Sequence, residues 1–119
     1  MILTETQSLI RDTARAFATD RLQPFAAEWD RAGAFPRATL AEMAALGLMG
    51  MLVPEEWGGA GADHVAYALA LEEIAAGDGS CSTIMAVHNS VACMPILRFG
   101  TPAQKERFLR PLARGEMLG

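Results

Sequence analysis

The stretch from Gly79 to Leu97 is 19 residues long and contains no charged side chain. As a helix it is nearly long enough to cross a bilayer, for which about 20 apolar residues are needed. Its polar side chains argue against a membrane, because such groups are costly in lipid. The stretch therefore predicts a buried central helix rather than a membrane span. Its polar residues and proline are Ser80, Ser82, Thr83, His88, Asn89, Ser90 and Pro95.

The length and composition indicate one domain over residues 1–119. About half of the residues are hydrophobic (51%) and 20% are charged, as in a soluble globular protein. The net charge is −4, and the scattered basic residues form no stripe that could neutralise a nucleic-acid backbone, so no nucleic acid is expected as a partner. The N-terminus lacks the basic and apolar regions of a secretory signal, so the expected location is cytoplasmic.

Capping signals and helical spacing predict three helices in the first part of the chain. Thr4 and Gln7 form a capping-box pattern, which predicts a helix over about residues 5–22. Pro24 and Pro36 are each placed to begin a further helix, because proline is tolerated in the first helical turn.

A long connection rich in glycine runs from Gly47 to Ala62, where the helical periodicity fails. Loops of this length are uncommon in compact domains and usually have a function. Within it, Gly58-Gly59-Ala60-Gly61 could cradle a phosphate with backbone amides. The motif lacks the full spacing of a P-loop or a dinucleotide fingerprint. A structural turn that uses the positive φ of glycine is the preferred interpretation.

The second part of the chain predicts three more helices. Asp63 can cap a fourth helix, the central helix follows over about residues 80–99 with a kink expected at Pro95, and Thr101 opens a sixth that ends near Gly115. No segment shows the alternating pattern of a strand. We therefore expect an all-α bundle of about six helices, with the two most apolar ones, the fourth and fifth, at its centre.

Cysteine and histidine offer little sign of chemistry. Cys81 and Cys93 lie twelve residues apart on one expected helix, about 18 Å apart, too far for a disulfide. With His64 and His88 they show no metal-ligand spacing, so no metal site is expected. His88 could orient a ligand or move a proton. The alternative, favoured on the residues alone, is a core histidine bonded to a backbone carbonyl.

Six blocks of sequence resemble landmarks of the N-terminal helical domain of acyl-CoA dehydrogenases. Any one block is weak evidence, but the six occur in the family's order and spacing over residues 53–116. They are VPEEWGGAGAD (53–63), LEEIA (71–75), GDGS (77–80), VHNS (87–90), FGTPAQK (99–105) and PLARGE (111–116).

This resemblance implies part of an FAD-dependent enzyme that oxidises acyl-CoA to trans-2-enoyl-CoA. In the family a glutamate removes the α-proton and the flavin accepts the β-hydride. The glutamate and most of the flavin site belong to a middle β-domain and a C-terminal helical domain that this chain does not match. We therefore expect no catalytic or cofactor-binding residue here and no activity from this chain alone. The resemblance also implies that the native chain continues past Gly119, a homotetramer, and electron-transferring flavoprotein as electron acceptor.

The resemblance also implies a substrate site along the central helix. The pattern of Asn89, Ser90, Met94 and Pro95 aligns that helix with the one that follows the bound acyl chain in the family. An imidazole in this region favours short or branched acyl chains. The substrate-binding role is thereby carried to residues spaced i, i+3, i+4 and i+7, which can share one helix face. These are Ile84, Val87, His88 and Val91.

Two alternative functions stay open on the sequence. An acyl-CoA oxidase or a flavin monooxygenase of the same superfamily would share this domain and differ in how the reduced flavin meets oxygen. A non-catalytic helical module would instead bind another protein through exposed apolar faces.

Overall fold

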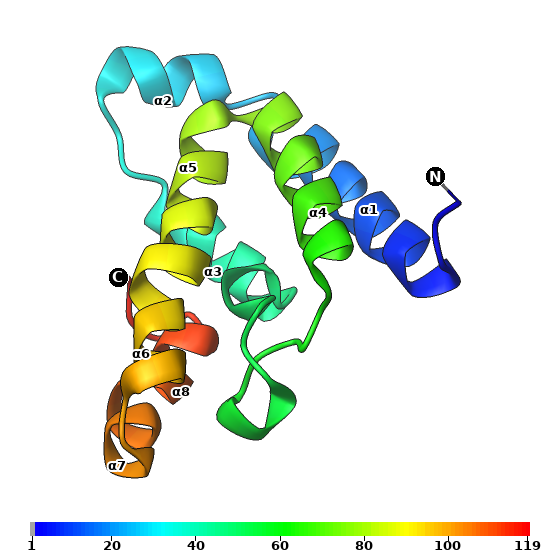
Figure 1. The fold of residues 1–119 in the computed structure, drawn as a ribbon. Coiled ribbons are helices and arrows are strands. Elements are labelled where there is room, and N and C mark those ends of the chain that lie inside the picture. Colours follow the sequence, from blue (N-terminus) through cyan, green and yellow to red (C-terminus); the bar gives the residue numbers. More distant parts are fainter. Residues whose placement is uncertain (1) are drawn as a thin grey trace.

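The computed structural model describes residues 2–119 and contains six continuous helices (Figure 1). No strand occurs among these residues, which confirms the predicted all-α class. The long connection lies between the third and fourth helices and holds two short 3-10 turns, η2 (Leu48–Gly50) and η3 (Glu55–Trp57). The helices are α1 (Glu5–Phe17), which continues through η1 (Ala18–Leu22); α2 (Ala26–Ala32); α3 (Arg37–Ala45); α4 (His64–Gly77); α5 (Gly79–Val87), which continues through η4 (His88–Cys93) into α6 (Met94–Phe99); and α7 (Pro102–Gln104), which continues through η5 (Lys105–Leu109) into α8 (Arg110–Ala113).

The predicted helix starts are confirmed by their capping bonds. Thr4 accepts a hydrogen bond from the Gln7 amide at 3.1 Å, and Gln7 returns one to the Thr4 amide at 2.9 Å. Thr101 and Gln104 form the same reciprocal pair. The Asp63 carboxylate accepts from the amide of the third residue of α4 at 2.8 Å. Each cap satisfies amides that the first helical turn leaves without partners.

Wide π-helical turns interrupt three of the helices, and each ends two residues before a proline. Proline lacks an amide hydrogen, and its ring clashes with the carbonyl four residues earlier. A wider turn moves that carbonyl aside, so the irregularity expected in the central helix takes this form. The three pairs are η1 and Pro24, η4 and Pro95, and η5 and Pro111.

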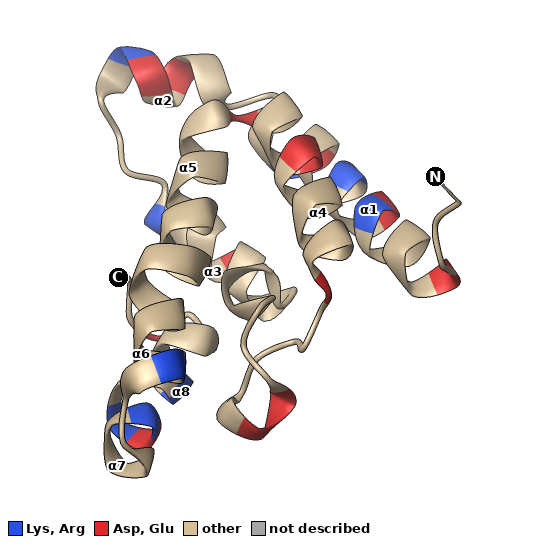
Figure 2. Ribbon diagram, in the orientation of Figure 1, with Lys and Arg blue, Asp and Glu red and all other residues tan. Residues whose placement is uncertain are grey.

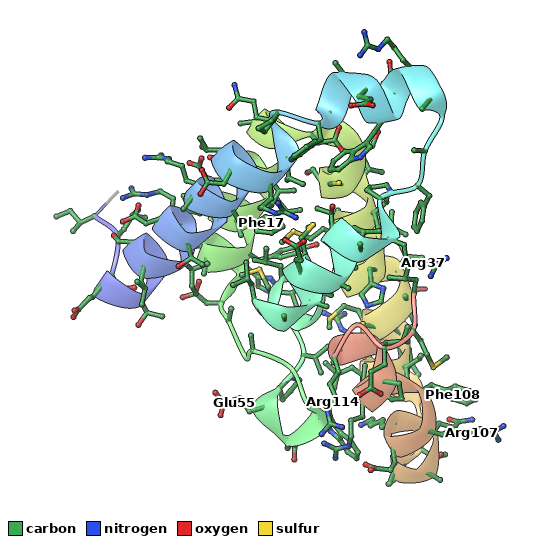
Figure 3. All side chains as sticks on the ribbon, turned by 180° about the vertical axis from the view of Figure 1, so that it is seen from behind. Phe17, Arg37, Glu55, Arg107, Phe108 and Arg114 are labelled. Carbon is green, nitrogen blue, oxygen red and sulfur yellow. The ribbon has the colours of Figure 1, made fainter. Side chains whose placement is uncertain are left out.

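The core consists of two hydrophobic clusters that meet along the central helix, Gly79–Phe99. The larger cluster lies between the first, third, fourth and central helices, and Figure 3 shows Phe17 pointing into it from α1. Met85 of the central helix belongs to this cluster. The smaller cluster joins the glycine-rich loop to the last helix and includes Cys93. Helix α2 has no buried residue and lies at one end of the molecule (Figure 1).

The central helix is less enclosed than its composition predicts. By length and composition, the helix is long and apolar enough to cross a membrane. Two of its apolar side chains are nevertheless exposed: Val87 is 42% exposed and Val91 68% exposed. The molecule measures 41 × 38 × 19 Å and is therefore flat. The central helix is therefore buried on one face and open on the other. The absence of membrane insertion stays a prediction.

Candidate functional site

A small groove opens on the exposed side of the central helix. Its volume is about 240 Å³, and three separate segments form its walls: the α2–α3 connection, the central helix, and residues 115–119. The lining residues are Phe35, Thr83, Ile84, Val87, Leu118 and Gly119. Phe35, Val87 and Leu118 are each more than a third exposed, so apolar side chains from three parts of the chain gather around one open space.

The groove suits a hydrocarbon rather than a charged ligand. None of its lining residues is charged, and Figure 2 shows α5 without acidic or basic residues. Its one hydroxyl, on Thr83, donates to the Gly79 carbonyl of its own helix at 3.1 Å. The volume lies below the roughly 300–1,000 Å³ of ordinary small-molecule pockets. The space therefore fits a short apolar portion of a ligand.

The structure brings together three of the four residues expected to bind substrate. Ile84 and Val87 line the groove, and Val91 lies one turn further along the same exposed side. His88 is 1% exposed and lies on the buried side. With 3.6 residues per turn, the four positions span an arc of about 100°, and the edge of the buried face passes through it. The spacing alone could not show on which side of that edge each residue falls.

Both ring nitrogens of His88 have partners inside the protein. Nε2 lies 2.7 Å from the Leu112 carbonyl oxygen, and Nδ1 lies 3.2 Å from the Gly119 amide nitrogen. A carbonyl only accepts and an amide only donates, so we assign the neutral ring with its proton on Nε2. The imidazole is thus bonded as a core histidine, as the residues alone favoured, and presents no free nitrogen to the groove.

Asn89 is a second buried polar residue of the central helix, and sequence reasoning assigned it no role. It is fully buried. Its Oδ1 accepts from the amides of Met51 at 2.8 Å and Leu52 at 3.5 Å. Its Nδ2 donates to the carbonyls of Leu48 at 2.9 Å and Met85 at 3.0 Å. The amide therefore fastens the start of the glycine-rich loop to the central helix. Its only signal in the sequence is a polar residue within an apolar helix.

The glycine-rich motif at residues 58–61 is a structural turn, which confirms the preferred interpretation. A Cβ at Gly59 would collide with the Val53 carbonyl, so only glycine fits there. Because the four amides of the motif are already bonded, they cannot cradle a phosphate. In order along the motif, they donate to the carbonyls of Glu55, Pro54, Gly50 and Val53.

Neither the loop nor the cysteines provides a cofactor, metal or nucleophile site. With its amides bonded, the loop does not fit the diphosphate of FAD. Residues 2–119 contain no group of three or more side chains that could hold a metal ion. Burial raises the pKa of the Cys81 thiol to about 12 and that of Cys93 to about 11, so both stay protonated at neutral pH.

Comparison with known proteins identifies the domain. Residues 4–116 match the family described as Acyl-CoA dehydrogenase, N-terminal domain. The mitochondrial short-chain specific acyl-CoA dehydrogenase of Bos taurus is 46% identical over 117 residues, which cover 98% of this chain and 28% of that protein. The chain thus spans less than a third of the length of the curated relatives that it matches.

Solved structures share the fold closely. A chain in a structure described as the electron transferring flavoprotein of Acidaminococcus fermentans matches with a TM-score of 0.96 and 37% identity, over all of this chain and 31% of that one. The butyryl-CoA dehydrogenase of Megasphaera elsdenii matches with a TM-score of 0.93 and 35% identity, over all of this chain and 32% of that one. The family is FAD-dependent. This chain therefore belongs to the acyl-CoA dehydrogenase family, as its N-terminal domain.

Proposed function

We propose that the chain is the N-terminal part of an FAD-dependent dehydrogenase that oxidises short-chain acyl-CoA to trans-2-enoyl-CoA. The observation that carries this proposal is the uncharged groove on the open side of the central helix, in a domain of this family. A soluble domain that leaves Val87 and Val91 exposed has apolar surface free for a ligand or for another part of the protein.

The proposed role of this chain is to hold the hydrocarbon end of the substrate. Ile84 and Val87 form one wall and Leu118 the opposite one. Each methylene removed from water contributes about 0.8 kcal/mol, and contact with apolar walls keeps water away from the bound chain. FAD supplies the hydride acceptor in this family, and the glycine-rich loop, whose amides are already bonded, gives it no phosphate cradle. The flavin and the catalytic base therefore belong, in this proposal, to the remaining length of the protein.

A preference for short acyl chains follows from the size of the groove. Its volume of about 240 Å³ is bounded by the large side chains of Phe35 and Leu118. The name of the similar bovine enzyme, short-chain specific, supports the same preference.

The partners are also part of the proposal. Electron-transferring flavoprotein is the proposed acceptor, supported by the similarity to the Acidaminococcus fermentans structure described by that name. A homotetramer of the full-length protein and a cytoplasmic location stay predictions from the sequence.

An anaerobic spectral titration of the full-length protein tests the proposed function. We expect a bound flavin whose visible absorption bleaches when butyryl-CoA is added, because the substrate reduces it. Rapid reoxidation of the reduced flavin by oxygen would favour the acyl-CoA oxidase alternative. A full-length protein without flavin would contradict the proposal and favour the helical interaction module.

A further inference from the structure

Residues 115–119, which follow the last helix, run back along the central helix and complete the groove (Figure 1). Leu118 and Gly119 line the groove together with Ile84 and Val87 of the central helix. A Cβ at Gly119 would collide with the Cβ of Ala92, so this residue lies directly on the central helix. Neither a helix nor a strand holds the segment in place. Its position therefore depends on a few specific contacts.

His88 makes one contact with the last turn of α8, just before the segment, and one with the end of the segment. The Leu112 carbonyl accepts from the ring Nε2 at 2.7 Å, and the same carbonyl accepts from the Gly115 amide at 3.0 Å in the turn that begins the segment. The Gly119 amide donates to Nδ1 at 3.2 Å. The ring thus joins the central helix to the last turn of α8, from which the segment starts, and to the end of the segment. At 1% exposure, it makes these bonds with almost no competition from water.

We propose that His88 is a positioning residue that sets the acyl-chain length accepted by the groove. This inference rests on the proposed function. His88 fixes Gly119 on the central helix and thereby holds the neighbouring Leu118 opposite Val87. It acts through the 115–119 segment and does not touch the substrate, because its nitrogens are bonded elsewhere.

To hold the segment, the side chain at position 88 must supply one hydrogen-bond donor and one hydrogen-bond acceptor. Leucine at position 88 fills a similar space but can do neither, so the segment loses its attachment and the Leu118 wall is free to move away. A longer or branched acyl chain then gains room, whereas butyryl loses a contact. Glutamine offers an amide oxygen for Gly119 and an amide N–H for the Leu112 carbonyl, so it can replace both bonds.

The test uses the full-length flavoprotein and measures kcat/KM for hexanoyl-CoA and butyryl-CoA. We expect His88→Leu to raise the ratio of kcat/KM for hexanoyl-CoA to kcat/KM for butyryl-CoA about fivefold. This factor corresponds to the free energy of one ordinary neutral hydrogen bond. His88→Gln should stay close to the wild-type ratio. Gly119→Ala displaces the same segment while leaving the imidazole intact, and it should raise the ratio similarly. The double variant should show less than the sum of the two effects, because both act through one contact.

A matched control separates positioning from general destabilisation. Met85 lies on the same buried face as His88 but does not line the groove, so Met85→Ala should lower the melting temperature and leave the ratio unchanged. Nitrogen-15 NMR gives a readout independent of activity, and it should show a neutral ring protonated at Nε2.

The inference is overturned if His88→Leu and Gly119→Ala both retain flavin and the wild-type ratio, or if Nδ1 carries the proton. Failure of the proposed function looks different, because the wild-type flavin would then not bleach with any acyl-CoA.

Discussion

Replacement of Asn89 by alanine is the sharpest test of how the glycine-rich loop is held. The Asn89 amide accepts from the backbone of Met51 at 2.8 Å and donates to that of Leu48 at 2.9 Å, and it is fully buried. Alanine removes both hydrogen-bonding groups of the side chain. The Met51 amide and the Leu48 carbonyl then stay buried without these partners. The loop and the central helix then lose their direct polar connection.

The expected loss is about 3 kcal/mol in the free energy of unfolding. Each buried polar group left without a partner costs about 1–3 kcal/mol, and at least two groups are affected. A chain of this size is stable by on the order of 10 kcal/mol, so the loss is a large fraction of the total. With an unfolding entropy of about 2.1 cal/mol/K per residue, it corresponds to a decrease in Tm of about 12 °C.

Urea denaturation of the 119-residue chain, followed by far-ultraviolet circular dichroism, measures this effect. The midpoint should fall for Asn89→Ala while the slope stays unchanged. The neighbouring variant Ser90→Ala is the matched control, since Ser90 is exposed and bonds only the Ala86 carbonyl of its own helix. It should change stability by less than about 0.5 kcal/mol. An Asn89→Ala loss below about 1 kcal/mol would refute the reasoning.

Four further predictions follow. Val87→Asp in the full-length enzyme should raise KM for butyryl-CoA at least ~10-fold, because a carboxylate faces the acyl chain, and steady-state kinetics with an unchanged KM would contradict it. Cys81 and Cys93 should resist iodoacetamide at pH 8 until urea unfolds the chain, as mass spectrometry can show, since burial raises both thiol pKa values. The hydrogen bond from Arg15 lowers the pKa of Glu73, so its stabilisation is present above the usual carboxyl pKa of 4.5 and is lost at lower pH. Glu73→Gln should therefore destabilise the chain at pH 7, and urea midpoints should show that the difference shrinks as the pH falls below 4.5. The isolated chain should neither turn over acyl-CoA nor retain FAD in dialysis.

The local elements of the fold were predictable because their signals are local. A capping residue such as Thr4 or Asp63 fixes a helix start through bonds within three residues, and Gly47 at φ +83° ends the third helix. The structure confirms these boundaries. The position of the glycine-rich loop between the third and fourth helices follows from them.

The orientation of the central helix was less predictable, because it depends on partners distant in sequence. Its stretch from Gly79 to Leu97 has no charged residue, and its polar residues lie on both faces: His88 and Asn89 are buried, whereas Thr83 and Ser90 are exposed. The helix face that carries His88 and Asn89 is turned inward by their hydrogen bonds. Asn89 bonds the loop, and His88 bonds Leu112 and Gly119. These contacts span 24 to 41 residues, and no local pattern encodes them.

A crystal structure of the full-length protein with bound butyryl-CoA tests most directly whether the groove holds the acyl chain. We predict that the terminal acyl carbons lie within about 4.5 Å of Ile84, Val87 or Leu118, which is van der Waals contact. An acyl chain bound elsewhere, with the open side of the central helix covered by another part of the protein, would contradict it.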